Sequence, residues 1–323
     1  MDKRFPIQDQ IEMLASALRG EVVTPRHAGY DDARAVANGM FDRRPAAVIR
    51  VANAADIAAV LNFAQATDLQ VAVRSGGHSV SGHSGNDGGL VIDLRKLDGI
   101  DIDTEARTAW VGTGLTAGAI TRAVERHGLI IGFGDSPTVG VGGLTLGGGI
   151  GYLTRKHGLT IDSLLAAEVV TAPGDIVIAD ATHHADLFWA LRGGGGNFGV
   201  ATRFKFRLHA LPAFTGGPLV LPATPEVLAG FAAAAERAPE ELTSIVMVMP
   251  APPLPFLPPE VHGRLVIVGA MAYAGAPEAA AEALAPFRAL ATPIADLVRP
   301  APYSSLYEPA PPEADRPSVS IRS

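Results

Sequence analysis

The spacing of apolar residues predicts alternating helices and strands in the first part of the chain. Apolar residues recur at helical spacing between Ile7 and Leu18, so an amphipathic helix is expected to open the fold. The mostly apolar sequence AAVIRV at 46–51 predicts a strand, Asn53 can cap the helix that follows, and residues 70–74 predict a second strand. Together these elements form a predicted β-α-β unit.

The middle of the chain shows the same order of elements a second time. A strand is predicted at 107–112, then a helix capped by Thr116 and stopped near Gly128, then a strand at 129–134. The patterns that follow predict a hairpin over 164–180 with Pro173 and Gly174 at its turn, a short helix over 186–191, and an alternating strand over 200–208.

After about residue 211 the composition shifts towards alanine and proline, and a second, smaller α+β domain is predicted. Its strands are expected at 217–221, 244–249 and 264–273, and its helices at 225–238 and 278–291. Residues 292–323 contain many prolines and little apolar periodicity, so they are expected to form a loop. The predicted domains are therefore 1–211 and 212–323.

Three glycine-rich segments interrupt these elements, at 74–89, 134–152 and 192–199. The second holds eight glycines in nineteen positions, far more than a turn requires. A dinucleotide diphosphate needs several backbone N–H donors turned towards one point, and a side chain would block that approach. Three such segments in one domain therefore favour a dinucleotide site, although a tight turn remains the alternative for each segment taken alone.

Composition and charge narrow the function classes. The formal net charge is −7 and no block of Lys or Arg occurs, which argues against a nucleic-acid partner. The chain has no cysteine, so disulfides, thiolate metal sites and a flavin–cysteine bond are excluded. Residues 1–14 hold no apolar stretch of signal-peptide length, and no apolar run long enough for a membrane span follows. We therefore expect a soluble, cytoplasmic protein without a membrane partner.

Two short motifs are partial matches to the nicotinamide-dinucleotide fingerprint. Residues 194–199 (GGGNFG) fit G-x-G-x-x-G, but they follow a predicted helix and precede a strand, the reverse of the required order. Residues 112–117 (GTGLTA) lie between a strand and a helix, and Asp135 lies about where a ribose-binding acid is expected. An NAD-dependent dehydrogenase is the weaker alternative, because it gives no role to the other glycine-rich segments or to His78, a histidine in the first of them.

Three long motifs resemble one flavoprotein family. They are RSGGHSVSGHSGNDGGLVIDL from Arg74, SPTVGVGGLTLGGGIGYLTRKHGLTIDSLLAAEVVTAPGDIV from Ser136, and DLFWALRGGGGNFGVAT from Asp186. Over roughly residues 40–210 they are similar to the FAD-binding domain of the berberine-bridge-enzyme-like and 6-hydroxy-D-nicotine-oxidase-like oxidoreductases of the vanillyl-alcohol-oxidase superfamily. The resemblance implies an α+β fold, in which a PCMH-type FAD-binding domain of two α/β subdomains precedes an incomplete α+β substrate domain with an antiparallel sheet.

The resemblance also assigns residues to the cofactor. In the family the histidine of the RSGGH motif forms an 8α-histidyl bond to FAD, and its position here is His78. The implied pyrophosphate contacts are Ser75, Gly76, Gly77 and Ser79. The implied isoalloxazine contacts are Ser136, Val139, Gly140, Gly142, Gly143, Gly148, Gly149 and Tyr152, and Gly199 and Val200 are implied near the adenine. Arg74 and Gly82 are further implied cofactor-binding positions.

The chemistry of His78 supports the same assignment without the family name. A neutral imidazole is a competent nucleophile near neutral pH, and the 8α carbon of a flavin becomes electrophilic in its quinone-methide tautomer. The alternative is that His78 only caps a turn. His83 is a competing candidate for the attachment, and the remaining histidines, including His183 and His184, are expected at the surface.

Two positions depart from the family pattern. Bicovalent members carry a cysteine immediately before the PTVG motif, where this chain has Ser136, so a single attachment is expected. Some members carry a histidine where this chain has Leu144, which removes one candidate for stabilising the negative charge of the reduced flavin. Backbone amides are expected to take over that task.

The family normally continues well beyond the position of Ser323, and that part usually supplies the catalytic base. The chain is therefore expected to be a fragment, to use a partner, or to be a degenerate relative. The predicted function is oxidation of a small organic substrate, an alcohol, sugar or amine, by hydride transfer to FAD, which O₂ or another acceptor reoxidises. A non-catalytic FAD-binding remnant is the alternative, and the substrate, the catalytic base and the oligomeric state stay open.

Overall fold

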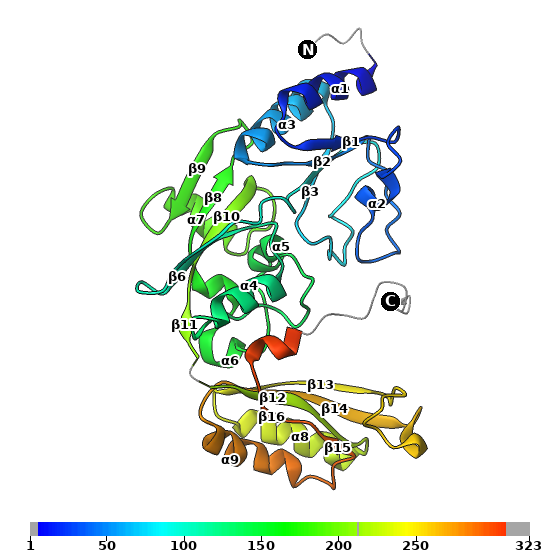
Figure 1. Ribbon diagram of the computed structural model, residues 1–323, viewed down its shortest axis with the longest axis vertical. Coiled ribbons are helices and arrows are strands. Elements are labelled where there is room, and N and C mark those ends of the chain that lie inside the picture. Colours follow the sequence, from blue (N-terminus) through cyan, green and yellow to red (C-terminus); the bar gives the residue numbers. More distant parts are fainter. Residues whose placement is uncertain (1–5, 212, 308–323) are drawn as a thin grey trace.

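Three main β-sheets follow one another along the long axis of the molecule, starting at the end where the amino terminus lies (Figure 1). The computed structural model describes residues 6–211 and 213–307. The first two sheets come from the residues before 211 and the third comes from the residues after it. The predicted α+β class, with its last sheet antiparallel, is confirmed.

The first sheet is parallel at its centre, as the predicted β-α-β unit requires. Its elements are β1 (Glu21–Val23), β2 (Ala47–Arg50), β3 (Val71–Arg74), β4 (Leu90–Asp93), α1 (Ile7–Ala17), α2 (Tyr30–Arg34) and α3 (Ala54–Thr67). The strand order is β1-β2-β4-β3, and β4 pairs in parallel with both β2 and β3. Asn53 caps α3 as predicted, since its side chain accepts a hydrogen bond from the amide of Asp56. Ile11, Ile57 and Ile92 are fully buried in the core that α1 and α3 share with this sheet.

The second sheet is antiparallel throughout. Its elements are β5 (Ile100–Asp103), β6 (Thr108–Gly112), β8 (Leu164–Val170), β9 (Ile176–Asp180) and β10 (Val200–Arg207), with helices α4 (Ala117–Glu125) and α7 (Ala185–Leu191) beside them. The strand order is β5-β6-β10-β8-β9. The predicted hairpin is confirmed as β8 and β9, with Gly174 at a φ of 95° in its turn. Thr116 caps α4 as predicted by accepting a hydrogen bond from the amide of Ala119.

The predicted strand at 129–134 is wrong in extent and in pairing. Only β7 (Leu129–Ile130) is a strand, and it pairs with β11 (His209–Ala210) rather than forming a β-α-β unit with β6. Ile131 and Phe133 are fully buried in the core below the second sheet without belonging to a strand. Their burial, and not pairing in a sheet, explains why this run is apolar.

The glycines of the segment 134–152 predict a continuous loop, but this prediction is wrong. Residues Val141–Leu146 form helix α5, on which Val141 and Thr145 are buried. The surrounding glycines obscured this helical spacing in the sequence. Two further short helices follow, α6 (Thr154–His157) and the 3₁₀ helix η1 (Thr160–Ser163).

The third sheet carries helices on one of its faces (Figure 1). Its elements are β12 (Thr215–Pro222), β13 (Leu242–Pro250), β14 (Leu265–Tyr273), β15 (Ala295–Asp296), β16 (Arg299–Pro300), α8 (Pro225–Arg237), α9 (Pro277–Arg288) and the 3₁₀ helix η2 (Pro259–Val261). The strand order is β13-β14-β12-β15, and β16 also pairs with β12. Phe231 of α8 and Phe287 of α9 meet edge to face, with ring centroids 4.9 Å apart, over Ile267 and Leu221 of the sheet.

Part of the expected loop at 292–323 is ordered structure that returns to the middle of the molecule. After β15 and β16 comes the 3₁₀ helix η3 (Tyr303–Tyr307), in which Tyr303 and Tyr307 are fully buried. The Tyr307 hydroxyl donates a hydrogen bond of 2.6 Å to the carbonyl of Gly134. Burial raises the pKa of Tyr307 well above its ordinary value, so the hydroxyl keeps its proton. Residues 308–323 lie outside the described residues.

Charge-assisted hydrogen bonds join α6 to the third sheet. Arg155 donates to the carbonyls of Leu242 at 2.8 Å and Ala238 at 2.7 Å, and Lys156 donates to the carbonyl of Ala274 at 2.7 Å. The third sheet is thus joined to the rest of the molecule by these hydrogen bonds as well as by the chain between β11 and β12, where the predicted domain boundary falls.

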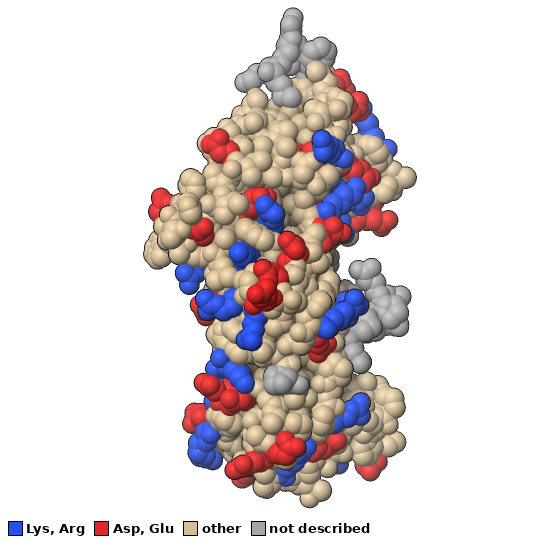
Figure 2. Space-filling model, turned by 60° about the vertical axis from the view of Figure 1, so that its left-hand side comes forward, with Lys and Arg blue, Asp and Glu red and all other residues tan. Residues whose placement is uncertain are grey.

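Lys and Arg side chains are interspersed with Asp and Glu over the face drawn in Figure 2. This mixed distribution agrees with a net charge of only −7 over the 323 residues. None of the helices in the described residues is long and apolar enough to span a bilayer.

We expect Tyr307→Phe to lower the free energy of unfolding by about 1–3 kcal/mol, because the buried carbonyl of Gly134 loses its donor. Denaturant unfolding followed by circular dichroism measures the change. Ser305→Ala in the same turn removes a hydroxyl that bonds only to the nearby Pro302 carbonyl, and it should change stability by less than about 0.5 kcal/mol. Equal stability of the Tyr307 variant and the wild type would contradict the proposed anchoring of η3.

Candidate functional site

The three glycine-rich segments, far apart in the sequence, line one cavity of about 590 Å³. The first segment leaves the end of β3, the second surrounds the start of α5, and the third lies between α7 and β10. A volume of this size is typical of ligand and cofactor sites. The predicted positions that line the cavity are Ser75, Gly76, Gly77, His78, Ser79, Val139, Gly140, Gly142, Gly143, Gly199 and Val200.

The first two segments touch backbone to backbone at Gly76 and Gly140. A Cβ atom added to Gly76 would lie 2.3 Å from the amide nitrogen of Gly140, and one added to Gly140 would lie 2.1 Å from that of Gly76. Any side chain at either position would therefore push the two segments apart. These two glycines are explained by contact between the segments, so the expectation that each glycine admits a ligand is too broad.

Other glycines leave space in the cavity wall or give the backbone an unusual conformation. An added Cβ at Gly143, Gly195 or Gly196 would meet no atom of a described residue within 4 Å. Gly77 and Gly199 adopt φ angles of 74° and 134°, which residues with a side chain rarely adopt. The open positions are those at which a bound molecule can approach the backbone closely.

Backbone donors on the first segment are available to a ligand. Within residues 6–211 and 213–307, the amides of Gly76, Gly77 and Ser79 donate no hydrogen bond to another residue. Backbone N–H groups need a partner, and several of them close together suit the oxygens of a diphosphate. This donor set, the open glycines and the cavity volume fit a dinucleotide cofactor.

Two histidines of the first segment line the cavity. His78 is half-buried, and its Nε2 atom lies 3.1 Å from Oγ1 of Thr138, a residue of the second segment. Ser136 lies next to this contact, with its Oγ 3.4 Å from the Thr138 hydroxyl. His83 also lines the cavity, but its side chain is exposed. The geometry therefore connects His78, and not His83, to the second glycine-rich segment through a side-chain contact.

The expectation that the remaining histidines lie at the surface is confirmed for His183 and His184 but is wrong for His157 and His209. His183 and His184 are exposed before α7. His157 and His209 are instead half-buried, and their rings stack with centroids 3.9 Å apart. Burial lowers the pKa of His157 to about 4, helped by the neighbouring His209, and burial also lowers the pKa of His209. Both rings are therefore neutral at pH 7, which the sequence did not indicate.

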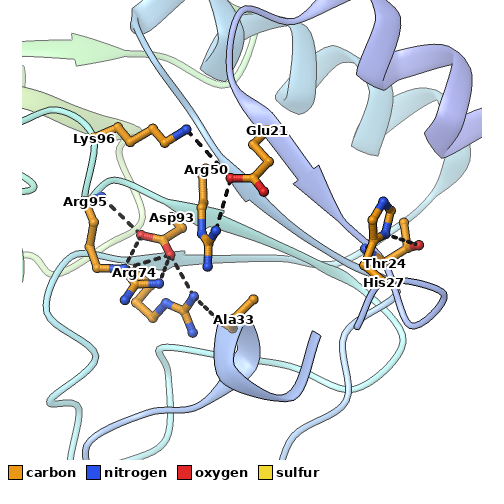
Figure 3. Close-up of polar contacts among 9 residues, drawn as sticks. All are labelled: Glu21, Thr24, His27, Ala33, Arg50, Arg74, Asp93, Arg95 and Lys96. Carbon is orange, nitrogen blue, oxygen red and sulfur yellow. Dashed lines mark hydrogen bonds and ion pairs between the residues drawn. The ribbon is translucent and has the colours of Figure 1, made fainter. Parts of the chain in front are cut away.

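A buried ion pair fixes the end of β3, from which the first segment departs (Figure 3). Arg74 Nη2 lies 2.8 Å from Asp93 Oδ2, and both side chains are almost fully buried. Arg74 also donates to the carbonyls of Ala33 and Ala35, and Arg95 adds a second ion pair of 2.6 Å to Asp93. Arg74, predicted as a cofactor-binding residue, thus lies outside the cavity lining in this structure and holds two parallel strand ends together.

Both charges of this pair persist despite their burial. Burial alone would raise the pKa of Asp93, but the hydrogen bonds and charges of Arg95 and Arg74 outweigh it and hold the pKa below its ordinary value. Burial lowers the pKa of Arg74, yet a guanidinium starts so high that it stays protonated. The pair therefore remains ionised at neutral pH.

The other predicted positions that fall outside the cavity lining, as far as the chain is described, are Arg74, Gly82, Ser136, Gly148, Gly149 and Tyr152. An added Cβ at Gly82 would lie 2.7 Å from the ring of Phe41, and one at Gly149 would lie 2.2 Å from Oγ1 of Thr160. Tyr152 is only 8% exposed and packs edge to face on the ring of Tyr307. In this structure these residues support the segments around the cavity.

Sequence reasoning singled out Leu144 but missed the rest of the apolar lining. The missed residues are Val73, Val80, Leu94, Leu146 and Ala201. Leu146 could have been found, because it is a large apolar residue inside a glycine-rich segment. Leu94 carried no such signal, since it continues the apolar run of β4.

Comparison with known proteins decides which cofactor this cavity fits. Residues 45–180 match the FAD binding domain family. Over 196 residues the chain is 40% identical to (R)-6-hydroxynicotine oxidase of Paenarthrobacter nicotinovorans, a match that spans 61% of this chain and 43% of that protein. The structure of 6-hydroxy-D-nicotine oxidase from Arthrobacter nicotinovorans is similar with a TM-score of 0.81 at 32% identity, over 90% of this chain and 63% of that one. BBE-like 1 of Physcomitrella patens gives a TM-score of 0.77 at 26% identity, over 90% of this chain and 61% of that one.

Residues 45–180 of this chain therefore form an FAD binding domain, and the chain resembles the 6-hydroxynicotine oxidases and the berberine-bridge-enzyme-like proteins. The relationship that its motifs predicted and the PCMH-type fold are confirmed. The chain spans less than two thirds of the length of each of these relatives.

The FAD-binding domain leaves the NAD alternative without support. In the 112–117 motif, an added Cβ at Gly112 or Gly114 would lie 2.1 or 2.0 Å from a backbone carbonyl, so packing explains both glycines. The 194–199 motif lies between α7 and β10, and this helix-to-strand order is the reverse of the Rossmann arrangement, as predicted. Neither motif therefore forms a nicotinamide-dinucleotide fingerprint.

Alanine substitutions separate the two classes of glycine. Gly76→Ala should lower the free energy of unfolding by about 1–3 kcal/mol or more, because the new methyl group collides with Gly140. Gly143→Ala should leave the stability of the cofactor-free protein unchanged or slightly higher, since the position is open and lies in α5. Denaturant unfolding and FAD titration measure both effects, and Gly143→Ala should weaken FAD binding only. The interpretation fails if Gly76→Ala is as stable as Gly143→Ala.

Asp93→Asn should lower the free energy of unfolding by about 3–5 kcal/mol, because it leaves the Arg74 charge buried without a counter-charge. Asp87→Asn is the matched control, since it breaks the exposed pair with Arg43, leaves an amide oxygen for the Arg44 amide, and should cost less than about 1 kcal/mol. Because the pKa of Asp93 is lowered, its ionised carboxylate stabilises the fold at pH values above the ordinary carboxyl range. This stabilisation is lost as the pH falls through the lowered pKa. The free energy of unfolding, measured by denaturant unfolding at a series of pH values, should therefore decrease more steeply with falling pH for the wild type than for Asp93→Asn.

Proposed function

We propose that this chain holds FAD in the cavity between the three glycine-rich segments, with the flavin bonded through its 8α carbon to His78. The observation that carries the proposal is that eleven positions from three separate segments, His78 among them, line one cavity. The match of residues 45–180 to the FAD binding domain supports the identity of the cofactor.

Different residues of the cavity bind different parts of FAD. The amides of Gly76, Gly77 and Ser79 offer hydrogen-bond donors to the diphosphate. The open backbone of the second segment around Gly143 receives the isoalloxazine ring, and the third segment, at Gly199 and Val200, lies near the adenine. The predicted positions outside the lining act through the segments that they support.

The proposed reaction is the two-electron oxidation of a small organic substrate, an alcohol, sugar or amine. FAD, when bound, supplies the acceptor for the hydride, and O₂ or another acceptor reoxidises it. The half-buried apolar side chains of Leu144 and Leu146 reduce the access of water to that part of the cavity, which strengthens the hydrogen bonds made by the backbone amides. The neutral imidazole of His78 acts as the nucleophile that forms the covalent attachment.

The attachment is tested by mass spectrometry of the peptide that contains His78. In the wild-type protein we expect this peptide to carry the added mass of FAD, and in His78→Ala we expect complete loss of that addition. Noncovalent FAD should remain in the His78→Ala protein at reduced affinity, because the diphosphate donors are backbone groups.

His83→Ala is the matched control, since His83 lines the same cavity and should keep the covalent flavin. Flavin that stays covalently bound in His78→Ala, or a wild-type protein that binds no FAD, would overturn the proposal. Anaerobic mixing with a panel of alcohols, sugars and cyclic amines then tests catalysis. Bleaching of the flavin by a donor supports an oxidoreductase, and a flavinylated protein inert to every donor supports a non-catalytic FAD-binding remnant.

A further inference from the structure

The contact between His78 and Thr138 joins two segments that lie 60 positions apart in the sequence. Oγ1 of Thr138 lies 3.1 Å from Nε2 of His78, and both residues are half-buried. The contact lies beside the place where Gly76 and Gly140 meet, so the backbone on both sides of it is closely packed. A hydroxyl is thus held against one particular nitrogen of the imidazole ring.

The backbone around Thr138 is fixed by the start of α4. The carbonyl of Pro137 accepts a hydrogen bond of 3.1 Å from the amide of Gly118, and the carbonyl of Val139 accepts one of 2.9 Å from the amide of Ala117. Thr138 lies between these two anchored residues. Its hydroxyl therefore has little freedom to move away from His78.

The chemistry of a neutral imidazole gives this contact a function. Such a ring has one nitrogen that carries a hydrogen and one that carries a lone pair, and only the second can bond to carbon. A threonine hydroxyl next to Nε2 can accept a hydrogen bond from Nε2–H, and in that arrangement the lone pair is on Nδ1. Once Nδ1 is bonded to carbon, Nε2 becomes an acceptor, and the same hydroxyl can turn and donate to it.

The attachment balances without any other group of the chain. A carbon–nitrogen bond forms, the flavin methyl and the imidazole lose one hydrogen each, and two electrons and two protons are released. Dioxygen accepts them and becomes hydrogen peroxide. The hydroxyl of Thr138 is not consumed, because it is both a donor and an acceptor and so matches the ring before and after the bond forms.

We propose that Thr138 is a positioning residue that orients the His78 ring and selects the tautomer able to bond to the flavin. This inference rests on the proposed attachment at His78. It assigns to the second glycine-rich segment a role in cofactor attachment, in addition to its role as part of the cavity wall.

The test compares the rate of covalent attachment in three variants. Protein produced under riboflavin limitation is mixed with FAD in air, and the covalently bound fraction is followed over time by mass spectrometry of the intact chain. Thr138→Val keeps the shape and removes the hydroxyl, so attachment should slow about tenfold or more, while the Kd for noncovalent FAD changes less than about threefold. Thr138→Ser keeps the hydroxyl and should attach FAD within about threefold of the wild-type rate.

Thr171→Val is the control, because it makes the same change in the turn between β8 and β9, outside the lining of the cavity, and should leave the rate near that of the wild type. If Thr138→Val attaches FAD as fast as the wild type does, the role of Thr138 is overturned and the proposed function stands. A slow Thr138→Ser variant also overturns it, since the hydroxyl would then not be the group that matters. A wild-type protein that binds FAD without any attachment, or binds none, refutes the attachment at His78 and this inference with it. If Thr138→Val misfolds, Thr138→Ala, which only removes atoms, gives the same comparison with Thr138→Ser.

Discussion

The site depends on the contact between Gly76 and Gly140, where two backbone segments lie closer than any side chain allows. One segment leaves the parallel sheet at the end of β3, and the other precedes α5 beside the antiparallel sheet. Because the contact brings two differently built sheets together, it sets the width of the cavity between them. It also places His78 within hydrogen-bond distance of Thr138. A wider separation would lose the cavity and the histidine contact together.

Each partner in this contact is held by its own sheet. On the first side, the buried pair of Arg74 and Asp93 ties the ends of the parallel strands β3 and β4 together, immediately before the glycines begin. On the second side, hydrogen bonds to the first residues of α4 fix the backbone on both sides of Thr138. The flexible residues are therefore confined to short stretches between rigid anchors, which is how a backbone rich in glycine can present donors in a defined arrangement.

The third sheet is connected to this assembly through two separate contacts. Arg155 reaches from α6 to the backbone carbonyls beside β13, and Tyr307 returns from the far end of the sheet to the carbonyl of Gly134. Gly134 begins the second glycine-rich segment, so the carboxy-terminal part of the described chain supports the wall of the FAD cavity.

The sequence alone determined the local features of the protein: the capped helices, the hairpin with Gly174 at its turn, the three glycine-rich segments and the family that they resemble. These features depend on residues close together in the chain, whose spacing and conformational preferences are visible in the letters. Only the tertiary structure decided which glycines serve packing and which leave room for a ligand, because both kinds have the same residue type. It also decided that Arg74 pairs with Asp93, that Tyr303 and Tyr307 are buried, and that Thr138 meets His78. Those contacts join residues that are distant in sequence, and the energies that select them arise only when the sheets pack.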